Sequence, residues 1–152
     1  MHRLLIFVAC LASLPAMAKN AHPASGAGAP EGFIQHYFDV FNAQDEKGLD
    51  TIFTKPFLRI TDGKTTAYSD WRDYINYKAI LATGWDRSII DHIEVVYDAQ
   101  DTAALKTLFS RLNAEGKVVA TAEILFIVAK KNRAWKLAAM AVPPSLPVSK
   151  NE

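Results

Sequence analysis

Apolar positions change their spacing near residue 87, from the three-to-four-residue repeat of helices to the alternation of strands. The first helix is predicted from residue 33 to 42, and four of the five side chains on its apolar face are aromatic: Phe33, Ile34, Tyr37, Phe38 and Phe41. Asp45 can cap a second, short helix that ends before Pro56. Ser69 can cap a third helix, which is expected to continue to Gly84. The pattern therefore predicts three helices before residue 85.

Strands are predicted in two groups. Between the second and third helices, residues 57–60 and 65–68 form a short hairpin around a turn at 61–64. Beyond the third helix, turn residues separate four longer strands, expected at 89–97, 102–112, 118–129 and 134–142. Three successive hairpins indicate an antiparallel meander. The predicted fold class is α+β, with a curved antiparallel sheet wrapped around three N-terminal helices in a cone-shaped α+β barrel.

The strand expected at 118–129 is mostly apolar on both of its faces. One face must cover the helices, so the other is free to meet a second protein surface. This pattern predicts a homodimer formed through the outer surface of the sheet.

The first 18 residues have the composition of a secretory signal peptide. A basic start is followed by an apolar run from Leu4 to Leu14, which is too short to span a bilayer, and by the small-x-small triplet that ends at Ala18. Two alternatives are a mature N-terminal helix and a lipoprotein signal modified at Cys10. Cleavage after Ala18 predicts a periplasmic or secreted protein with no membrane attachment. The expected organisation is a signal peptide at 1–18, a flexible leader at 19–30, one domain at 31–142 and a tail at 143–152.

Charge and cysteine content exclude several functions. The chain has 17 basic and 16 acidic residues, and the signal peptide contains one basic residue, Arg3, and no acid, so 16 of each sign remain. The only basic cluster, Lys130, Lys131 and Arg133, falls in a predicted turn and is interpreted as solvated. Nucleic-acid binding is therefore not expected. No pair of histidines has metal-ligand spacing, and no phosphate-binding loop occurs, so we predict no metal and no cofactor.

Two short stretches carry a family resemblance. The first is FNAQDEKGLDTIF, in which Asn42, Ala43, Asp45, Leu49 and Phe53 match the usual helix-helix junction of the nuclear transport factor 2-like (NTF2-like) superfamily. The second, from Asn132 to Leu137, is similar to that superfamily's turn and last strand but lacks the usual glycine. The resemblance, which extends over residues 33–142, implies a cone with a pocket between sheet and helices. Isomerases, dehydratases, cyclases, ligand binders and interaction domains all use this fold.

Ketosteroid isomerase belongs to the same superfamily, and its catalytic pattern is only partly present. The resemblance places its oxyanion tyrosine on Tyr37, where a phenol could donate a hydrogen bond to an enolate. Its general base falls on Thr61, which cannot accept a proton from carbon, with Asp62 one position later. Asp91, which interrupts an apolar strand face, is a second candidate base. The structural alternatives are a core tyrosine, a turn residue at Asp62 and a hydrated carboxylate at Asp91.

Aromatic residues of the helical part could line a pocket for a small hydrophobic or aromatic molecule. The predicted ligand-binding residues are Tyr37, Phe41, Tyr68, Trp71 and Trp85. One alternative is a cofactor-free isomerase, dehydratase or cyclase that uses Tyr37 with Asp91 or Asp62. Another is an interaction domain whose pocket is filled by its own side chains. The volume of the pocket, and the distance between a phenol and a carboxylate inside it, distinguish these functions.

Overall fold

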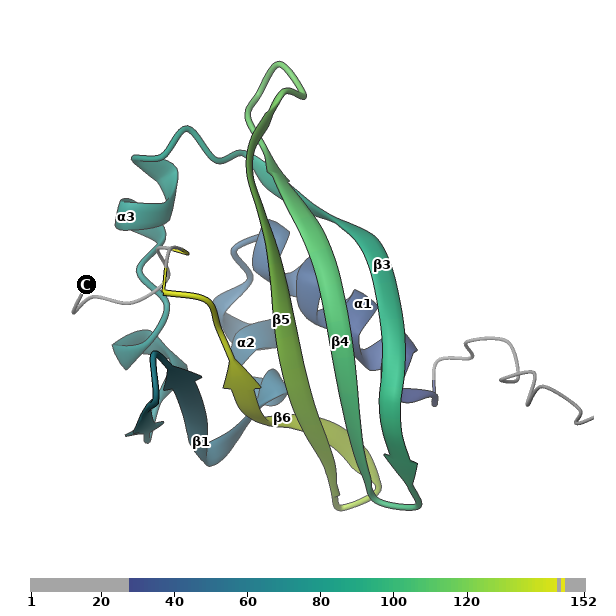
Figure 1. The fold of residues 1–152 in the computed structure, drawn as a ribbon. Coiled ribbons are helices and arrows are strands. Elements are labelled where there is room, and N and C mark those ends of the chain that lie inside the picture. The colour runs from purple at the N-terminus through teal and green to yellow at the C-terminus, as the bar shows by residue number, and fades with distance from the viewer. Residues whose placement is uncertain (1–27, 145, 147–152) are drawn as a thin grey trace, which may run out of the picture.

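The computed structural model describes residues 28–144 and residue 146, and within these ranges the chain folds as helices against one curved sheet (Figure 1). The predicted signal peptide and nearly all of the predicted leader lie outside the described residues. The helices are α1 (Pro30–Asn42), α2 (Glu46–Ile52), the 3-10 turn η1 (Trp71–Asp73) and α3 (Tyr77–Leu81). The strands are β1 (Phe53–Thr61), β2 (Lys64–Tyr68), β3 (Arg87–Ala99), β4 (Thr102–Leu112), β5 (Val118–Lys131) and β6 (Ala134–Ala141).

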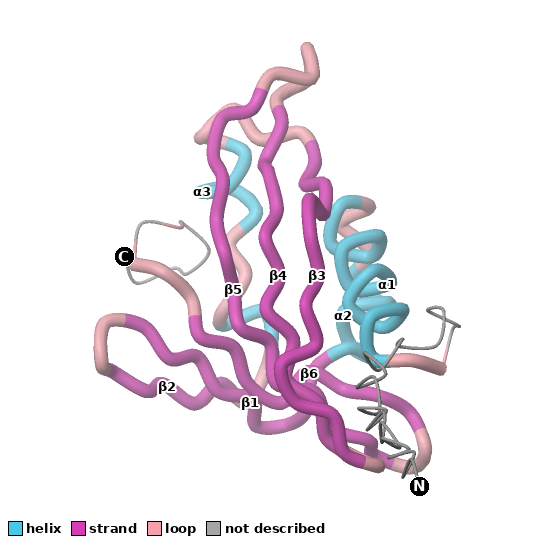
Figure 2. The backbone as a smooth tube through the Cα atoms, turned by 45° about the vertical axis from the view of Figure 1, so that its right-hand side comes forward, coloured by secondary structure: helices cyan, strands magenta, loops and turns pink. Residues whose placement is uncertain are grey.

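The sheet has the order β2-β1-β6-β5-β4-β3, and its last four strands form the predicted antiparallel meander (Figure 2). The α+β cone architecture is therefore confirmed. One pairing differs from the prediction, because β1 runs parallel to β6. These strands are far apart in the sequence, so no hairpin forces them to be antiparallel. The chain instead crosses through η1 and α3 to reach the far edge of the sheet at β3.

Helix α1 lies against the concave face of the sheet and supplies most of the aromatic core. The predicted apolar face is confirmed, since all five of its side chains are buried. The ring of Phe38 meets Phe109 of β4 at a centroid distance of 5.1 Å, and the ring of Tyr37 meets Phe126 of β5 at 5.7 Å. Edge-on contacts of this kind stabilise a core beyond the burial of area alone. The helix is thus fixed to the middle of the meander.

The predicted third helix is broken into two short pieces. The carboxylate of Asp70, rather than Ser69, caps η1 by accepting a hydrogen bond from the backbone N–H of Arg72 at 2.9 Å. The side chain of Asn76 then caps α3 by accepting from the N–H of Ala79. Short polar side chains bond to nearby backbone groups in this way and so compete with a continuous helix. The prediction of one continuous helix is therefore wrong, because the structure has two short helices with separate caps.

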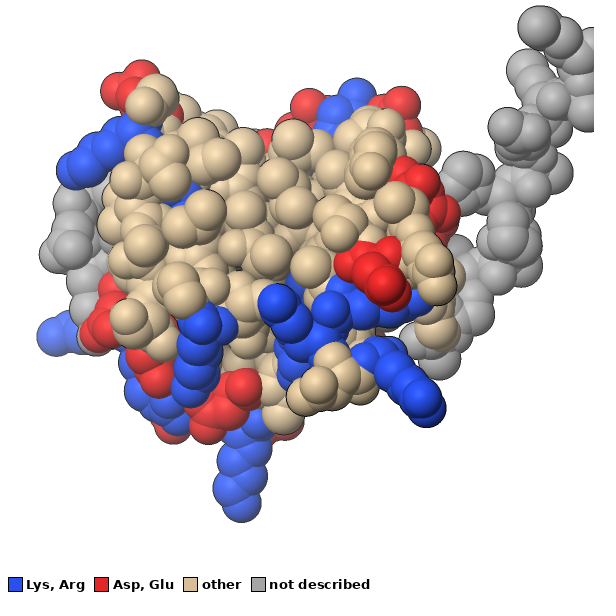
Figure 3. All heavy atoms as spheres, turned by 90° about the horizontal axis from the view of Figure 1, so that it is seen from below, with Lys and Arg blue, Asp and Glu red and all other residues tan. Residues whose placement is uncertain are grey.

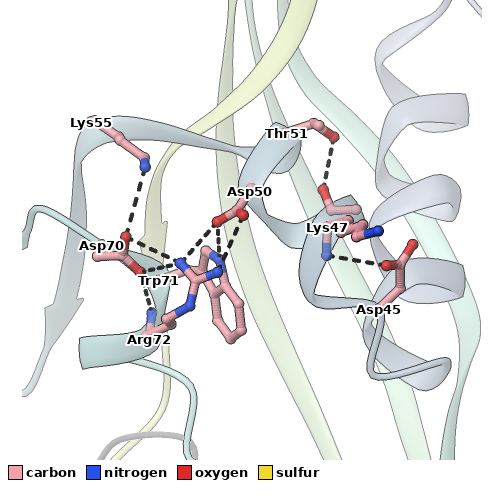
Figure 4. Close-up of polar contacts among 9 residues, drawn as sticks. Asp45, Lys47, Asp50, Thr51, Lys55, Asp70, Trp71 and Arg72 are labelled. Carbon is pink, nitrogen blue, oxygen red and sulfur yellow. Dashed lines mark hydrogen bonds and ion pairs between the residues drawn. The ribbon is translucent and has the colours of Figure 1, made fainter.

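An exposed ion-pair network attaches η1 to α2 (Figure 4). The guanidinium of Arg72 lies 2.9 Å from a carboxylate oxygen of Asp50 and 3.1 Å from one of Asp70, and it stacks over the ring of Trp71. The indole N–H of Trp71 also donates to Asp50, at 2.8 Å. Hydrogen bonds from Arg72 and then from Trp71 lower the pKa of the Asp50 carboxyl. The network fixes the start of the broken segment to the helical layer.

The outer face of the sheet carries an apolar row that crosses five strands. The row consists of Leu58, Ala139, Ile127, Ala104 and Tyr97, which are paired neighbours on β1, β6, β5, β4 and β3. Leu58 and Tyr97, at its two ends, are exposed. The second apolar face predicted for residues 118–129 therefore belongs to a wider apolar surface. We call this set of five residues the outer row.

Candidate functional site

The concave side of the sheet encloses a small cavity beside the C-terminal half of α1. Its lining is mainly aromatic and comes from α1, β3, β4, β5 and two connecting segments: Tyr37, Phe38, Phe41, Tyr74, Ser88, Phe109, Arg111, Ile124, Phe126 and Leu146. The volume is about 20 Å³. A cavity of this size has room for about one water molecule. We call it the inner cavity.

Arg111 is the one charged side chain in this lining, and it is 2% exposed. The alternation of β4 explains its position, because Leu105, Thr107 and Phe109 share its face and are all buried. Burial lowers the pKa of Arg111, while the phenols of Tyr37 and Tyr74 raise it. An arginine nevertheless remains protonated in a protein. The inner cavity therefore contains a permanent positive charge.

Two tyrosines accompany that charge. Burial raises the pKa of Tyr37 above its ordinary value, and Arg111 opposes the shift. Tyr74 has a pKa raised well above its ordinary value, again mainly by burial. Both phenols are therefore protonated at neutral pH and can act as hydrogen-bond donors; the hydroxyl of Tyr74 donates to the sulfur of Met140 at 2.9 Å. A guanidinium beside phenols can hold the oxygen atoms of a carboxylate, an enolate or a carbonyl.

Leu146 closes one side of the inner cavity. The chain leaves β6 with the N–H of Val142 donating to the carbonyl of Ile60 at 2.9 Å, and a turn then brings the N–H of Leu146 to the carbonyl of Pro143 at 3.2 Å. The Leu146 side chain is only 3% exposed. Residues 143–152 were predicted to form a tail, so this contact was not expected from the sequence. The one available signal was an apolar residue among proline and serine.

The predicted ligand-binding residues divide into two groups. Tyr37 and Phe41 line the inner cavity. Trp85 packs its ring against Phe41 at 5.4 Å and donates its indole N–H to Ser88, so it supports the wall from behind. Tyr68 and Trp71 are absent from the lining. Tyr68 stacks on Phe57 at 5.3 Å, and Trp71 bonds to Asp50 in the surface network.

The candidate catalytic residues do not converge. Asp62 is exposed in the turn between β1 and β2, with a φ angle of 49°. Asp91 is also exposed, at an irregularity in the pairing of β3, and accepts a hydrogen bond from Ser110 at 2.7 Å. Ser110 pairs with Thr121 on the outer face of the sheet, so Asp91 joins the face opposite to the inner cavity. Neither carboxylate shares the cavity with Tyr37.

Arg111 is a site residue that the sequence analysis did not single out. A pairing with Glu123 across the sheet does not form, because Glu123 pairs with Leu108 on the outer face, where its carboxylate lies 4.0 Å from Lys106. Arg111 pairs with Ala120 and points to the inside. Continuing the alternation of buried residues along β4 by one more step would have indicated this orientation.

Two features are absent from the described residues. No group of three or more His, Cys, Asp or Glu side chains in residues 28–144 could hold a metal ion. No helix in the same part of the chain is long and apolar enough to cross a membrane.

Residues 29–145 match the model of a protein family described as NTF2-like protein (DUF6841). The match covers most of the chain and includes every helix and strand described above. The chain belongs to this NTF2-like family. Its parallel β1–β6 pair and its aromatic cone are therefore features of an NTF2-like domain. A comparison with curated proteins found no match.

Solved structures support the same NTF2-like fold at low sequence identity. A protein of unknown function with a cystatin-like fold from Nostoc punctiforme PCC 73102 is 18% identical, with a TM-score of 0.61 over 77% of this chain and 90% of that one. An NTF2-like protein from Cytophaga hutchinsonii ATCC 33406 is 13% identical, with a TM-score of 0.56 over 74% and 93%. A candidate ketosteroid isomerase from Shewanella frigidimarina NCIMB 400 is 9% identical, with a TM-score of 0.56 over 76% and 94%. At these identities the likeness extends to the fold alone.

Proposed function

We propose that this NTF2-like domain binds a small aromatic molecule that carries a carboxylate, with the carboxylate on Arg111 and the ring among the aromatic side chains of the cone. The observation that carries the proposal is the position of Arg111, a buried cation in a mainly aromatic cavity. A carboxylate matches a guanidinium in charge and can accept two parallel hydrogen bonds from it. The protonated phenol of Tyr37 supplies a further donor.

The present volume of the inner cavity requires a rearrangement before such a ligand binds. A dry cavity of about 150 Å³ is known to hold benzene, and drug-sized ligands use about 300–1,000 Å³. The inner cavity has about 20 Å³. Leu146 is the lining residue that follows the last strand, which ends at Ala141. We therefore propose that the ligand displaces the Leu146 side chain and takes its place.

Binding is favoured over catalysis by the composition of the lining. In the described part of the chain, no aspartate or glutamate lines the inner cavity, and the nearest candidates from sequence, Asp62 and Asp91, are exposed elsewhere. An isomerase or dehydratase that removes a proton from carbon needs a base within reach of the substrate. Tyr37 and Arg111 can stabilise negative charge but are both protonated, so they cannot act as that base.

Titration with benzoate tests the proposal. Wild-type protein is expected to bind benzoate weakly, Leu146→Ala more tightly because the cavity is already open, and Arg111→Met not at all. Benzyl alcohol, which has the same ring without the charge, is the matched control and should bind all three proteins equally poorly. If Leu146→Ala remains folded by circular dichroism and yet shows no benzoate binding by calorimetry, the cone is a filled core and the interaction-domain alternative is preferred.

Two further parts of the proposal concern the assembly and the location of the protein. We propose a homodimer through the outer row, supported by its continuous apolar surface. A monomeric mass by light scattering at micromolar concentration would contradict it. We also propose export followed by cleavage after Ala18, supported by the sequence of residues 1–18. Intact-mass measurement on protein from a bacterial periplasm or culture medium is expected to give a chain that begins at Lys19.

A further inference from the structure

A second hollow lies outside the cone, beside the N-terminal half of α1. It is bounded by α1, the end of α2 and the β5–β6 hairpin, and we call it the basic groove: Gly28, Gly32, Phe33, His36, Thr51, Ile52, Lys130, Arg133, Ala134, Trp135 and Lys136. Its volume is about 540 Å³. This is within the range of small-molecule sites. The groove is therefore large enough for a ligand in the structure as it stands.

The lining of the basic groove combines positive charge with an apolar floor. Lys130, Arg133 and Lys136 are cationic, His36 adds an imidazole, and no aspartate or glutamate is among the described lining residues. Phe33, Ile52 and Trp135 are nearly buried and supply the floor. Figure 3 shows several lysine and arginine side chains on the underside of the molecule, with aspartate and glutamate side chains among them. The described lining itself is therefore positively charged.

Two of these cations are held in place by the protein. The Lys130 ammonium lies 4.7 Å from the centre of the Trp135 ring and donates to the carbonyl of Gln100 at 2.8 Å. Asp101 lies 3.9 Å from the same ammonium, and Asp98 lines an adjoining hollow, so carboxylates border the groove on the Lys130 side. The Lys136 ammonium donates to the carbonyl of Thr51. An ammonium has three N–H donors, so both lysines retain donors for a ligand.

Arg133 occupies an unfavourable backbone conformation at the rim of this groove. Asn132 and Arg133 form the two-residue turn between β5 and β6, with φ angles of 52° and 66°. The left-handed region suits glycine or asparagine, and a long side chain there destabilises the turn. Residues in such conformations cluster at functional sites. The Arg133 guanidinium lines the groove from this turn.

We propose that the basic groove binds a small organic phosphate, with the phosphate on Arg133 and Lys136 and the organic part on the floor formed by Phe33, Ile52 and Trp135. A phosphate dianion matches several cations at once, and arginine binds it through two parallel hydrogen bonds. The groove and the inner cavity are lined by different residues. The two sites can therefore be tested independently.

Phenyl phosphate is the probe, and Arg133→Gly is the decisive variant. Glycine relieves the strained turn, so the variant should unfold at a higher temperature than wild type while its affinity for phenyl phosphate falls about tenfold or more. A loss of binding in a more stable protein cannot be attributed to misfolding. Lys136→Met should weaken binding similarly, and Lys64→Met, which removes an exposed lysine on β2, should leave it unchanged.

Other outcomes of the calorimetric titration would overturn the inference. It fails if phenyl phosphate does not bind wild type at millimolar concentration, or if it binds Arg133→Gly and Lys136→Met as well as wild type. If inorganic phosphate binds as tightly as phenyl phosphate, the organic group contributes no affinity, and that part of the proposal is wrong. Vesicles containing phosphatidylglycerol that bind through Arg133, in the absence of phenyl phosphate binding, would make the groove a membrane-surface site instead.

Discussion

Helix α1 contributes to two hollows of opposite character. Its C-terminal half supplies Tyr37, Phe38 and Phe41 to the inner cavity, which has about 20 Å³. Its N-terminal half supplies Phe33 and His36 to the basic groove, which has about 540 Å³. The family resemblance implied a pocket between the sheet and the helices, where the inner cavity lies. In this chain the larger space lies outside the cone.

The positive charges of the two sites also differ in their exposure to water. Arg111 is buried, so an anion beside its guanidinium would be attracted more strongly there than at an exposed site. The cations of the basic groove remain hydrated, and each contributes less, with a dependence on salt concentration. We therefore expect the inner cavity to select a ligand by shape and by one charge. The groove should select by total charge.

Phe126→Ala should have the largest effect on stability, and it would remove part of the lining of the inner cavity. The Phe126 ring is fully buried and contacts both Tyr37 and Phe38. Replacing a buried phenylalanine by alanine costs about 3–5 kcal/mol in the free energy of unfolding. Urea unfolding should show this loss. His36→Ala, in an exposed position on the same helix, is the control and should change stability by less than about 0.5 kcal/mol.

Leu146→Ala should cost less than Phe126→Ala because a smaller buried side chain is removed. We expect a loss of about 2 kcal/mol, at the lower end of the range for buried leucine. Saturating benzoate should recover part of this loss in the variant, since a ligand that binds only the folded state stabilises it. Thermal unfolding with and without benzoate measures both effects. No stability loss in the variant would mean that Leu146 does not close the cavity in solution.

Arg133→Gly should have a smaller effect of opposite sign on stability. A left-handed conformation costs a non-glycine residue roughly 1–2 kcal/mol, and part of the gain is offset by the greater freedom of glycine in the unfolded chain. We expect a net stabilisation of about 1 kcal/mol in urea unfolding. Gly63→Ala provides the converse test at a φ angle of 72° and should destabilise. Equal stability of wild type and Arg133→Gly would mean that the turn relaxes in solution.

The regular parts of the fold could be predicted from local pattern, whereas both sites depend on contacts between distant residues. The aromatic face of α1 and the strands on either side of residues 113–117 are where the periodicity placed them. The broken third helix was not predicted because Asp70 and Asn76 compete locally for backbone N–H groups. The turn residues Lys131, Asn132 and Arg133 are exposed, as predicted, but the sequence does not show that α1 lies beside this turn. Leu146 was missed for the same reason.

The smallest effect on stability is expected from replacing Asp50. Its partner Arg72 is exposed, in contrast to the buried Arg111. The hydrogen bonds from Arg72 and Trp71 lower the pKa of Asp50 in the folded protein. Asp50 therefore stabilises the fold at pH values above its unfolded pKa, and this contribution is lost as the pH falls through the lowered folded pKa.

Replacing Asp50 with asparagine should consequently destabilise the protein slightly at pH 7 and progressively less as the pH falls below the unfolded pKa, as measured by urea unfolding over that range. Arg72→Met should reproduce the loss at pH 7, and the double variant should lose little more than either single one, because the two side chains act through one interaction. If the stability losses of the two single variants add in full, each side chain stabilises the protein through a separate interaction. Since both groups are exposed and screened by water, their loss should be far smaller than that caused by Phe126→Ala, so the fold depends on the aromatic core rather than on its surface ion pairs.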